Sequence, residues 1–326
     1  MMNCYLITGG AGFFGSIMKR ILLDGGNRVV SIDLQDDNLV EENFIAYKGD
    51  INDDALMSRI FEEYKFDAIY HFAALLAHVK SELKNLWHAN VDGTANVAKY
   101  AAQYGVERVI FTSSNCLWAD NFTYKITEEE VPCPIEIYGK SKLEGEKILL
   151  SHNEFVSIIF RCPTIMDEGR LGLLGILYQF IYAKDLANAC LLARNYNRSD
   201  VFNIGSDDVK DFRTVYRYVI EKAGSKSRLL FLPKGLMIAG MKICFALGIS
   251  PLGPYQYKMI ASNFVFDTTK IKRELGWMPT KTNEEMLLTA YSYYHNNREE
   301  ILSRKDVSAH SSVAKMGIIK LIKWFC

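Results

Sequence analysis

The chain has 326 residues, of which 49% are hydrophobic and 23% are charged, and its formal net charge is zero. A chain of this size can bury one large α/β core and a smaller lobe, and its neutral charge excludes the basic field typical of nucleic-acid-binding proteins. Its seven cysteines are scattered without a paired metal-ligand spacing, so we expect a reduced, cytoplasmic protein without a metal site.

A glycine-rich turn follows the first predicted strand. The apolar run 4–7 precedes TGGAGFFG at 8–15, and apolar residues at helical spacing continue over 16–23. In a strand, turn and helix of this order, glycines permit a tight turn, close approach of backbone N–H groups to a pyrophosphate, and close packing of the helix on the strand. The motif predicts a dinucleotide site, although glycine turns also occur for purely structural reasons.

An acidic residue ends the second predicted strand, 28–33. Asp33 lies eighteen positions after Gly15, where a carboxylate accepts hydrogen bonds from an adenosine ribose; its alternative role is to cap a loop. No arginine follows directly to receive a 2′-phosphate, so NAD is favoured over NADP. The third predicted strand, 44–51, brings Asp50 within reach of the adenine amino group.

Helices and strands then alternate along the chain. We predict helices over 55–64 and 86–104, and strands over 67–72 and 109–113. Strands separated by helices indicate a parallel, doubly wound sheet.

Ligands of such a sheet bind beyond the carboxyl ends of its strands. Ala73, Ala74 and Ser114 fall at that edge. His71 lies near it and is expected to be a packed strand histidine. For His78, in the following loop, substrate contact and solvent exposure both stay open.

Tyr138 and Lys142 are four residues apart, so on a helix they share one face. A free tyrosine has a pKa of about 10. A neighbouring ammonium and a positively charged nicotinamide favour the phenolate, which makes tyrosine a usable base near neutral pH. We expect Ser114 to bond the same substrate oxygen and Lys142 also to hold the nicotinamide ribose. Exposed Tyr and Lys at this spacing are common, so only the glycine turn makes the pair specific.

These motifs resemble, in order and spacing, the extended short-chain dehydrogenase/reductases, and more closely their NAD-dependent epimerase/dehydratase group, which acts on nucleotide sugars. The resemblance covers residues 3 to about 165 strongly, and 180–193 and 263–294 more weakly. It implies an enzyme with a Rossmann doubly wound parallel sheet, a smaller and shortened C-terminal substrate lobe, and dimerisation through two Rossmann helices.

The resemblance also implies roles for individual residues. Ser114, Tyr138 and Lys142 would be catalytic. The residues expected at the cofactor are Gly9, Gly12, Phe13, Phe14, Gly15, Asp33, Asp50, Ile51, Phe72, Ala73, Ala74, Asn90, Ser113, Tyr138, Lys142 and Pro163. The residues expected at the substrate are His78, Cys116 and Thr164.

Two residues depart from the dehydratases of the family. Asn115 and Cys116 stand where those enzymes have an Asp-Glu pair, so dehydration is disfavoured. Cys116 matches an acid/base cysteine of related GDP-sugar epimerase-reductases, and its alternative role is that of a small packing residue.

The predicted substrate lobe departs further from the sequence pattern of the family. Thr164 replaces an asparagine, and Tyr178 replaces a diphosphate-binding arginine. Only eighteen residues separate Arg161 from Phe180. The short segment 165–180 therefore indicates either a reduced sugar-nucleotide pocket or residues absent from the sequence.

Two apolar stretches are unusual. Residues 235–249 are apolar apart from Lys242 and are too short to cross a bilayer, which needs about 20 residues. They predict a helix of the lobe or an interfacial one. The tail 313–326 combines three lysines with an aromatic-rich apolar face. It predicts a basic amphipathic helix that docks on its own domain, on a partner or on a membrane surface.

We therefore expect an NAD-binding Rossmann domain over 1–160, to which 180–205 return, a substrate lobe mainly over 161–300, and a tail over 301–326. The predicted function is NAD-dependent epimerisation, or net dehydrogenation, of a nucleotide sugar by transient hydride transfer with Tyr138 as base. One alternative is a membrane-associated enzyme acting on a lipid-linked sugar or a sterol-like alcohol. The other is a non-catalytic NAD-binding regulator.

Overall fold

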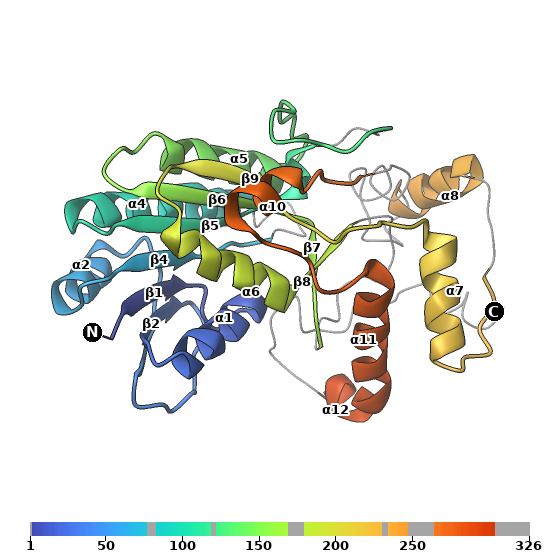
Figure 1. Ribbon diagram of the computed structural model, residues 1–326, viewed down its shortest axis with the longest axis horizontal. Helices are drawn as coiled ribbons and strands as arrows, with labels where there is room; N and C mark the ends of the chain where they lie inside the picture. The colour runs from blue at the N-terminus through green and yellow to red at the C-terminus, as the bar shows by residue number, and fades with distance from the viewer. Residues whose placement is uncertain are drawn as a thin grey trace.

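The computed structural model describes residues 2–76, 83–118, 122–168, 179–229, 234–246 and 264–303. Its centre is a seven-stranded parallel sheet with the order β3-β2-β1-β4-β5-β6-β9 (Figure 1). The strands are β1 Cys4–Thr8, β2 Arg28–Asp33, β3 Phe44–Lys48, β4 Ala68–His71, β5 Arg108–Ser114, β6 Val156–Cys162 and β9 Asp200–Asn203. The predicted fold class, a Rossmann doubly wound parallel sheet, is confirmed.

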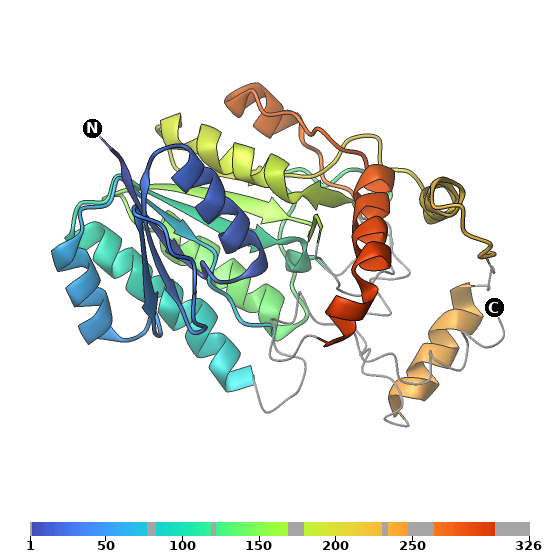
Figure 2. The same ribbon diagram turned by 90° about the horizontal axis from the view of Figure 1, so that it is seen from below.

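Helices cover both faces of the sheet (Figures 1 and 2). α1 (Phe13–Asp24) and α6 (Ala183–Leu192) contribute to the apolar cluster on one face. α2 (Asp54–Glu63), α4 (Gly93–Gln103) and α5 (Ile137–Leu150) contribute to the cluster on the other. Because both faces are covered, the central strands are buried on both sides, which explains their continuous apolar sequences.

The helix predicted over 86–104 is not uniform. α3 (Leu83–Trp87) is followed by a π-helical turn (His88–Asp92), and α4 begins only after it. In this turn the N–H of Gly93 bonds to the carbonyl oxygen five residues back. Asn90 is buried within the turn, and such turns are frequent at functional sites.

The third strand is shorter than the predicted 44–51 and ends at Lys48. The Asp50 carboxylate accepts the backbone N–H of Asn52 at 2.9 Å, which turns the chain away from the sheet. Asp53 then caps the N-terminus of α2.

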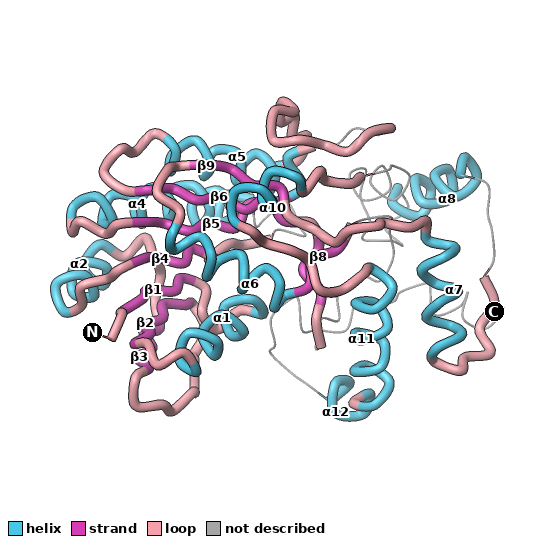
Figure 3. Tube along the Cα trace, viewed as in Figure 1, coloured by secondary structure: helices cyan, strands magenta, loops and turns pink. Residues whose placement is uncertain are grey.

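A smaller second part lies at the carboxyl ends of the strands (Figure 3). It consists of β7 and residues 179–182, 205–229, 234–246, 264–268 and 278–303; the remainder, including α10 (Thr269–Leu275), which packs beside β9, is called the sheet part. β7 (Thr164–Met166) and β8 (Phe180–Tyr182) pair in parallel, and α7 (Phe212–Lys222) packs on α11 (Asn283–Asn296). The other helices of the second part are α8 Lys234–Ala246 and α12 Arg298–Ser303.

Long-range polar contacts fasten the second part. The Gln179 amide donates to the carbonyl of Ser206 at 2.7 Å and accepts the N–H of Phe266 at 2.8 Å. The Asn283 amide oxygen accepts the Ser206 hydroxyl at 2.6 Å. An isolated β-bridge between Ile126 and Phe266 connects this part to the sheet part.

Several predicted features lie outside the described residues. They are His78, Tyr178, the tail 313–326, the end of the apolar stretch 235–249 and most of the short segment 165–180. Within the described helices, none has the length and apolar character required to cross a bilayer.

Candidate active site

A cavity of about 480 Å³ opens at the carboxyl ends of the strands, the edge where ligands bind in doubly wound folds. The predicted site residues that line it are Gly9, Gly12, Phe13, Phe14, Gly15, Asp33, Asp50, Ile51, Phe72, Ala73, Ala74, Ser113, Ser114, Cys116, Tyr138, Lys142, Pro163 and Thr164. Asn90 does not line the cavity, and His78 is not among the described residues.

The glycine turn is packed too closely for side chains. Gly9 has a φ of +76°, and a Cβ there would lie 2.8 Å from the backbone nitrogen of Ala73. A Cβ on Gly15 would lie 2.1 Å from the carbonyl oxygen of Gly9. Helix α1 starts directly behind this turn, with Gly12 as its N-cap. This turn and the start of α1 present backbone N–H groups with no side chain in front of them, which suits the binding of a pyrophosphate.

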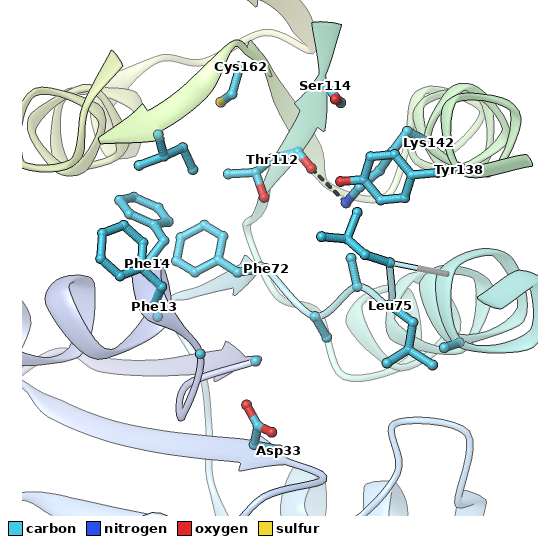
Figure 4. A pocket seen from close by; sticks show the side chains of 18 of the residues that line it. Phe13, Phe14, Asp33, Phe72, Leu75, Thr112, Ser114, Tyr138, Lys142 and Cys162 are labelled. Carbon is cyan, nitrogen blue, oxygen red and sulfur yellow. Dashed lines mark hydrogen bonds between the residues drawn. The ribbon is translucent and has the colours of Figure 1, made fainter. Parts of the chain in front are cut away.

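Asp33 lies at the end of the cavity opposite Tyr138 (Figure 4). Its two carboxylate oxygens accept the backbone N–H groups of Ala11 and Gln35, each at 3.0 Å. These bonds orient the carboxylate and leave lone pairs for further donors such as ribose hydroxyls. The cavity therefore has a site for phosphate at the glycine turn and a carboxylate for a ribose at Asp33, with Tyr138 at the opposite end. This arrangement fits NAD.

Tyr138 and Lys142 lie on α5, and Ser114 ends β5, at the same end of the cavity (Figure 4). Lys142 Nζ donates to the carbonyl oxygen of Thr112 at 2.9 Å and lies 5.9 Å from the centre of the Tyr138 ring. Burial lowers the pKa of Lys142 to about 8, so the ammonium remains its main form at neutral pH. Ser114 Oγ accepts the N–H of Cys116 at 3.1 Å, which holds the hydroxyl at the strand end.

His71 is a packed strand histidine, as predicted, and it is fully buried between two threonines. The Thr94 hydroxyl donates to the Asn90 carbonyl at 2.6 Å, so it accepts the imidazole Nε2–H at 2.8 Å. Nδ1 then accepts the Thr8 hydroxyl at 2.7 Å, and Thr8 Oγ1 accepts the N–H of Ala73 at 3.2 Å. Burial lowers the pKa of His71 to about 3, so the ring is neutral and all bonds run in one direction.

Asn90 joins this chain of hydrogen bonds to α5. Its amide oxygen accepts the N–H of Leu75 at 2.8 Å, and its amide nitrogen donates to the Leu75 carbonyl at 3.1 Å and to Ser141 Oγ at 3.0 Å. The Ser141 hydroxyl donates to the carbonyl of Tyr138 at 2.7 Å. Asn90 therefore holds the cavity wall against the helix that carries the tyrosine.

Other residues complete the cavity lining without having been predicted. They are Ile32, Leu34, Gln35, Gly49, Leu75, Leu76, Ala89, Thr112, Asn115, Cys162 and Ile165. Thr112 and Cys162 lie near strand ends, a position that could have identified them. Leu75 carries no comparable signal, because its position depends on the bonds made by Asn90.

A second cavity has a volume of about 520 Å³. Its lining includes Phe122, whose ring centre lies 5.5 Å from that of Tyr124 and 6.2 Å from that of Phe264. Thr164 of β7 lines the first cavity, and its register partner Phe180 of β8 lines the second. The paired strands therefore contribute to the lining of both cavities.

Comparison with known proteins gives consistent matches. Residues 5–170 match the NAD dependent epimerase/dehydratase family. The uncharacterized protein y4nG of Sinorhizobium fredii is 30% identical, over 98% of this chain and 85% of that protein. A UDP-glucose 4-epimerase of Lactobacillus helveticus is 26% identical, over 90% of this chain and 97% of that protein. The Bordetella bronchiseptica enzyme WbmG, solved in complex with NAD, has the same fold, with a TM-score of 0.75, 21% identity, and coverage of 91% of this chain and 95% of that chain.

Proposed function

Because the chain belongs to the NAD-dependent epimerase/dehydratase family, whose cofactor is the one predicted from the sequence, we propose that it epimerises a nucleotide sugar. The observation that carries the proposal is the grouping of Tyr138, Lys142 and Ser114 at the cavity end opposite Asp33. The similarity to a UDP-glucose 4-epimerase makes a UDP-sugar the first substrate to test.

NAD supplies a reversible hydride acceptor when bound. Tyr138 is the base that takes the proton of a sugar hydroxyl, and Ser114 donates a hydrogen bond to the same oxygen. The Lys142 ammonium, held by the Thr112 carbonyl beside the tyrosine ring, stabilises the phenolate electrostatically. Loss of water is disfavoured because Asn115 and Cys116 offer no carboxylate at the cavity.

The second cavity is proposed to receive the nucleotide half of the substrate. Tyr124, which is exposed, offers an aromatic ring for a base, and Lys125 and Lys210 offer cations for phosphate beside the carboxylates of Asp207, Asp208 and Asp211. The pairing of Thr164 with Phe180 supports this placement, because it puts the two cavities on neighbouring strands. A ligand with two halves can then occupy both cavities.

The test is incubation of the purified protein with NAD and a panel of UDP-, GDP-, CDP- and dTDP-sugars. NADH is followed by absorbance, and the products are separated by chromatography. We expect a changed sugar without net NADH. Accumulating NADH with an oxidised product would instead make the protein a net dehydrogenase. No turnover across the panel, with NAD still bound, would contradict the proposal.

A further inference from the structure

Helix α8 has an exposed apolar stripe. It lies, with α7, at the end of the molecule opposite the N-terminus (Figures 1 and 2). Leu236 and Ile243 are 63% and 60% exposed, and Ala239 and Gly240 between them are also exposed. The spacings of three, one and three residues place all four on one face of the helix.

The opposite side of α8 is more buried. Ile238 and Met241, on that side, are only partly exposed. The orientation of α8 therefore directs its apolar stripe outward among the described residues. Large exposed apolar side chains grouped on one face are typical of an interaction surface.

Positive charge is concentrated in the same region. From Arg213 to Ala246 the sequence has seven lysines and arginines and one acidic residue, Glu221, in a chain whose net charge is zero. The exposed cations of this segment include Arg217, Lys222, Lys226, Arg228 and Lys242. The apolar stripe thus belongs to a segment of the chain that is rich in exposed cations.

We propose that the α7–α8 region docks on the surface of an anionic lipid bilayer. Leu236 and Ile243 enter the boundary between headgroups and acyl chains, while the basic side chains contact anionic headgroups. A polyanion such as RNA would pair with the cations but leave the apolar stripe in water. The 13 residues of α8 reach only about 20 Å at 1.5 Å per residue, so the helix lies on the bilayer instead of crossing it.

The test is flotation of the full-length protein with two kinds of vesicle. One contains phosphatidylcholine alone, and the other contains equal parts of phosphatidylcholine and phosphatidylglycerol. We expect binding to the anionic vesicles only, weakened by high salt. The double variant Leu236→Asp, Ile243→Asp should lower partitioning by roughly tenfold or more, because it removes the inserted apolar area.

Variants of the basic side chains separate the electrostatic contribution to vesicle binding from that of the apolar stripe. Arg217→Glu with Lys226→Glu should lower partitioning by roughly fivefold or more for each cation replaced, since each substitution also adds a negative charge. Val131→Asp replaces an apolar residue that is 77% exposed elsewhere, and Lys65→Glu removes an exposed cation from the sheet part. Both control variants should bind as the unmodified protein does.

Four outcomes would overturn the proposal. The first is equal binding to both vesicles, and the second is full binding by the Leu236→Asp, Ile243→Asp variant. The third is loss of binding on removal of residues 304–326 together with full binding by that variant, which would assign the contact to the tail. The fourth is binding of RNA, or self-association, that depends on Leu236 and Ile243 when no vesicles bind.

Discussion

The sheet part and the second part of the molecule differ in how much backbone pairing holds them together. In the sheet part most contacts of this kind join one strand to the next: β1 pairs with β2 and with β4, and the glycine turn packs Gly9 and Gly15 closely against neighbouring backbone atoms. In the second part, single polar side chains connect distant loops, as Gln179 does with Phe266, 87 residues away. Close backbone contact requires particular residues at fixed spacing, whereas a long-range side-chain bond leaves no local pattern.

Mutations in the two parts should therefore have different consequences for activity. Changes in the sheet part should alter cofactor binding or the chemical step, and changes in the second part should alter substrate affinity. Four variants test this separation, in order of decreasing expected effect.

Tyr138→Phe should lower turnover by roughly 10³-fold, because general acid–base groups contribute about 10²–10⁴. The affinity for NAD should stay near that of the unmodified protein, since the ring and Lys142 remain. Turnover is measured with the sugar found in the panel, and NAD affinity by titration of protein fluorescence. Tyr64→Phe, whose hydroxyl bonds to Glu63 on the surface, is the control. Unchanged turnover would exclude Tyr138 as the base.

Gly9→Ala should lower the free energy of unfolding by about 2 to 5 kcal/mol, because alanine is strained in a left-handed backbone conformation and its Cβ would overpack against Ala73. NAD affinity should fall with it, because the cradle must shift. Gly26→Ala is a matched control, since Gly26 has a φ of +73° and a Cβ there would have nothing within 4 Å. It should cost about 1 to 2 kcal/mol and leave NAD affinity unchanged. Calorimetric titration measures the NAD affinity, and chemical denaturation measures the free energy of unfolding. Equal NAD affinities of the two variants would contradict the role of the turn.

Gln179→Ala should destabilise the protein by about 1 to 3 kcal/mol, because the Ser206 carbonyl and the Phe266 N–H lose their partner in the interior. Gln179 lines the second cavity, so the KM for the sugar nucleotide should rise while NAD affinity stays unchanged. Gln103→Ala, at an exposed position of α4, is the control. A change in NAD affinity alone would oppose the division between the two parts.

His71 should give the sheet part a pH-dependent stability. Its pKa is about 3 in the folded protein, against about 6.5 when unfolded, so the unfolded state binds more protons between these values. The stability contribution is present above pH 6.5 and is lost as pH falls toward 3, which amounts to about 2 kcal/mol between pH 7 and pH 5. Denaturant titrations at several pH values measure this slope. His71→Phe should be less stable at neutral pH but should lose about 2 kcal/mol less on acidification; identical slopes would contradict this account.

The sequence predicts the sheet part well because its elements follow local rules. Strand β2 has the predicted bounds, and the glycine turn, Asp33 and the Tyr138–Lys142 pair all lie at one cavity. Spacing alone leaves open whether the pair is catalytic or exposed decoration, and the expectation that it is catalytic comes from the resemblance to a family.

Other features of the site had no local signal. The π-helical turn at His88–Asp92 interrupts a sequence with ordinary helical periodicity, and it is stabilised by tertiary bonds from Asn90 to Leu75 and Ser141. Asn90, predicted at the cofactor, does not line the cavity, and its amide bonds to Leu75, which does. The second cavity was missed because its lining comes from segments more than a hundred residues apart, such as Phe122 and Phe264.

The bridge between Ile126 and Phe266 has a consequence for the order in which the chain folds. Ile126 donates its N–H to the carbonyl of Val265 and accepts the N–H of Asp267, both at 2.8 Å. These partners are synthesised about 140 residues later, and contacts of such sequence separation form late because long loops must close first. During synthesis the sheet strands up to β6 can associate before the loop around Ile126 has its partner. A ribosome-bound chain should therefore acquire the cradle for NAD well before it acquires the second cavity.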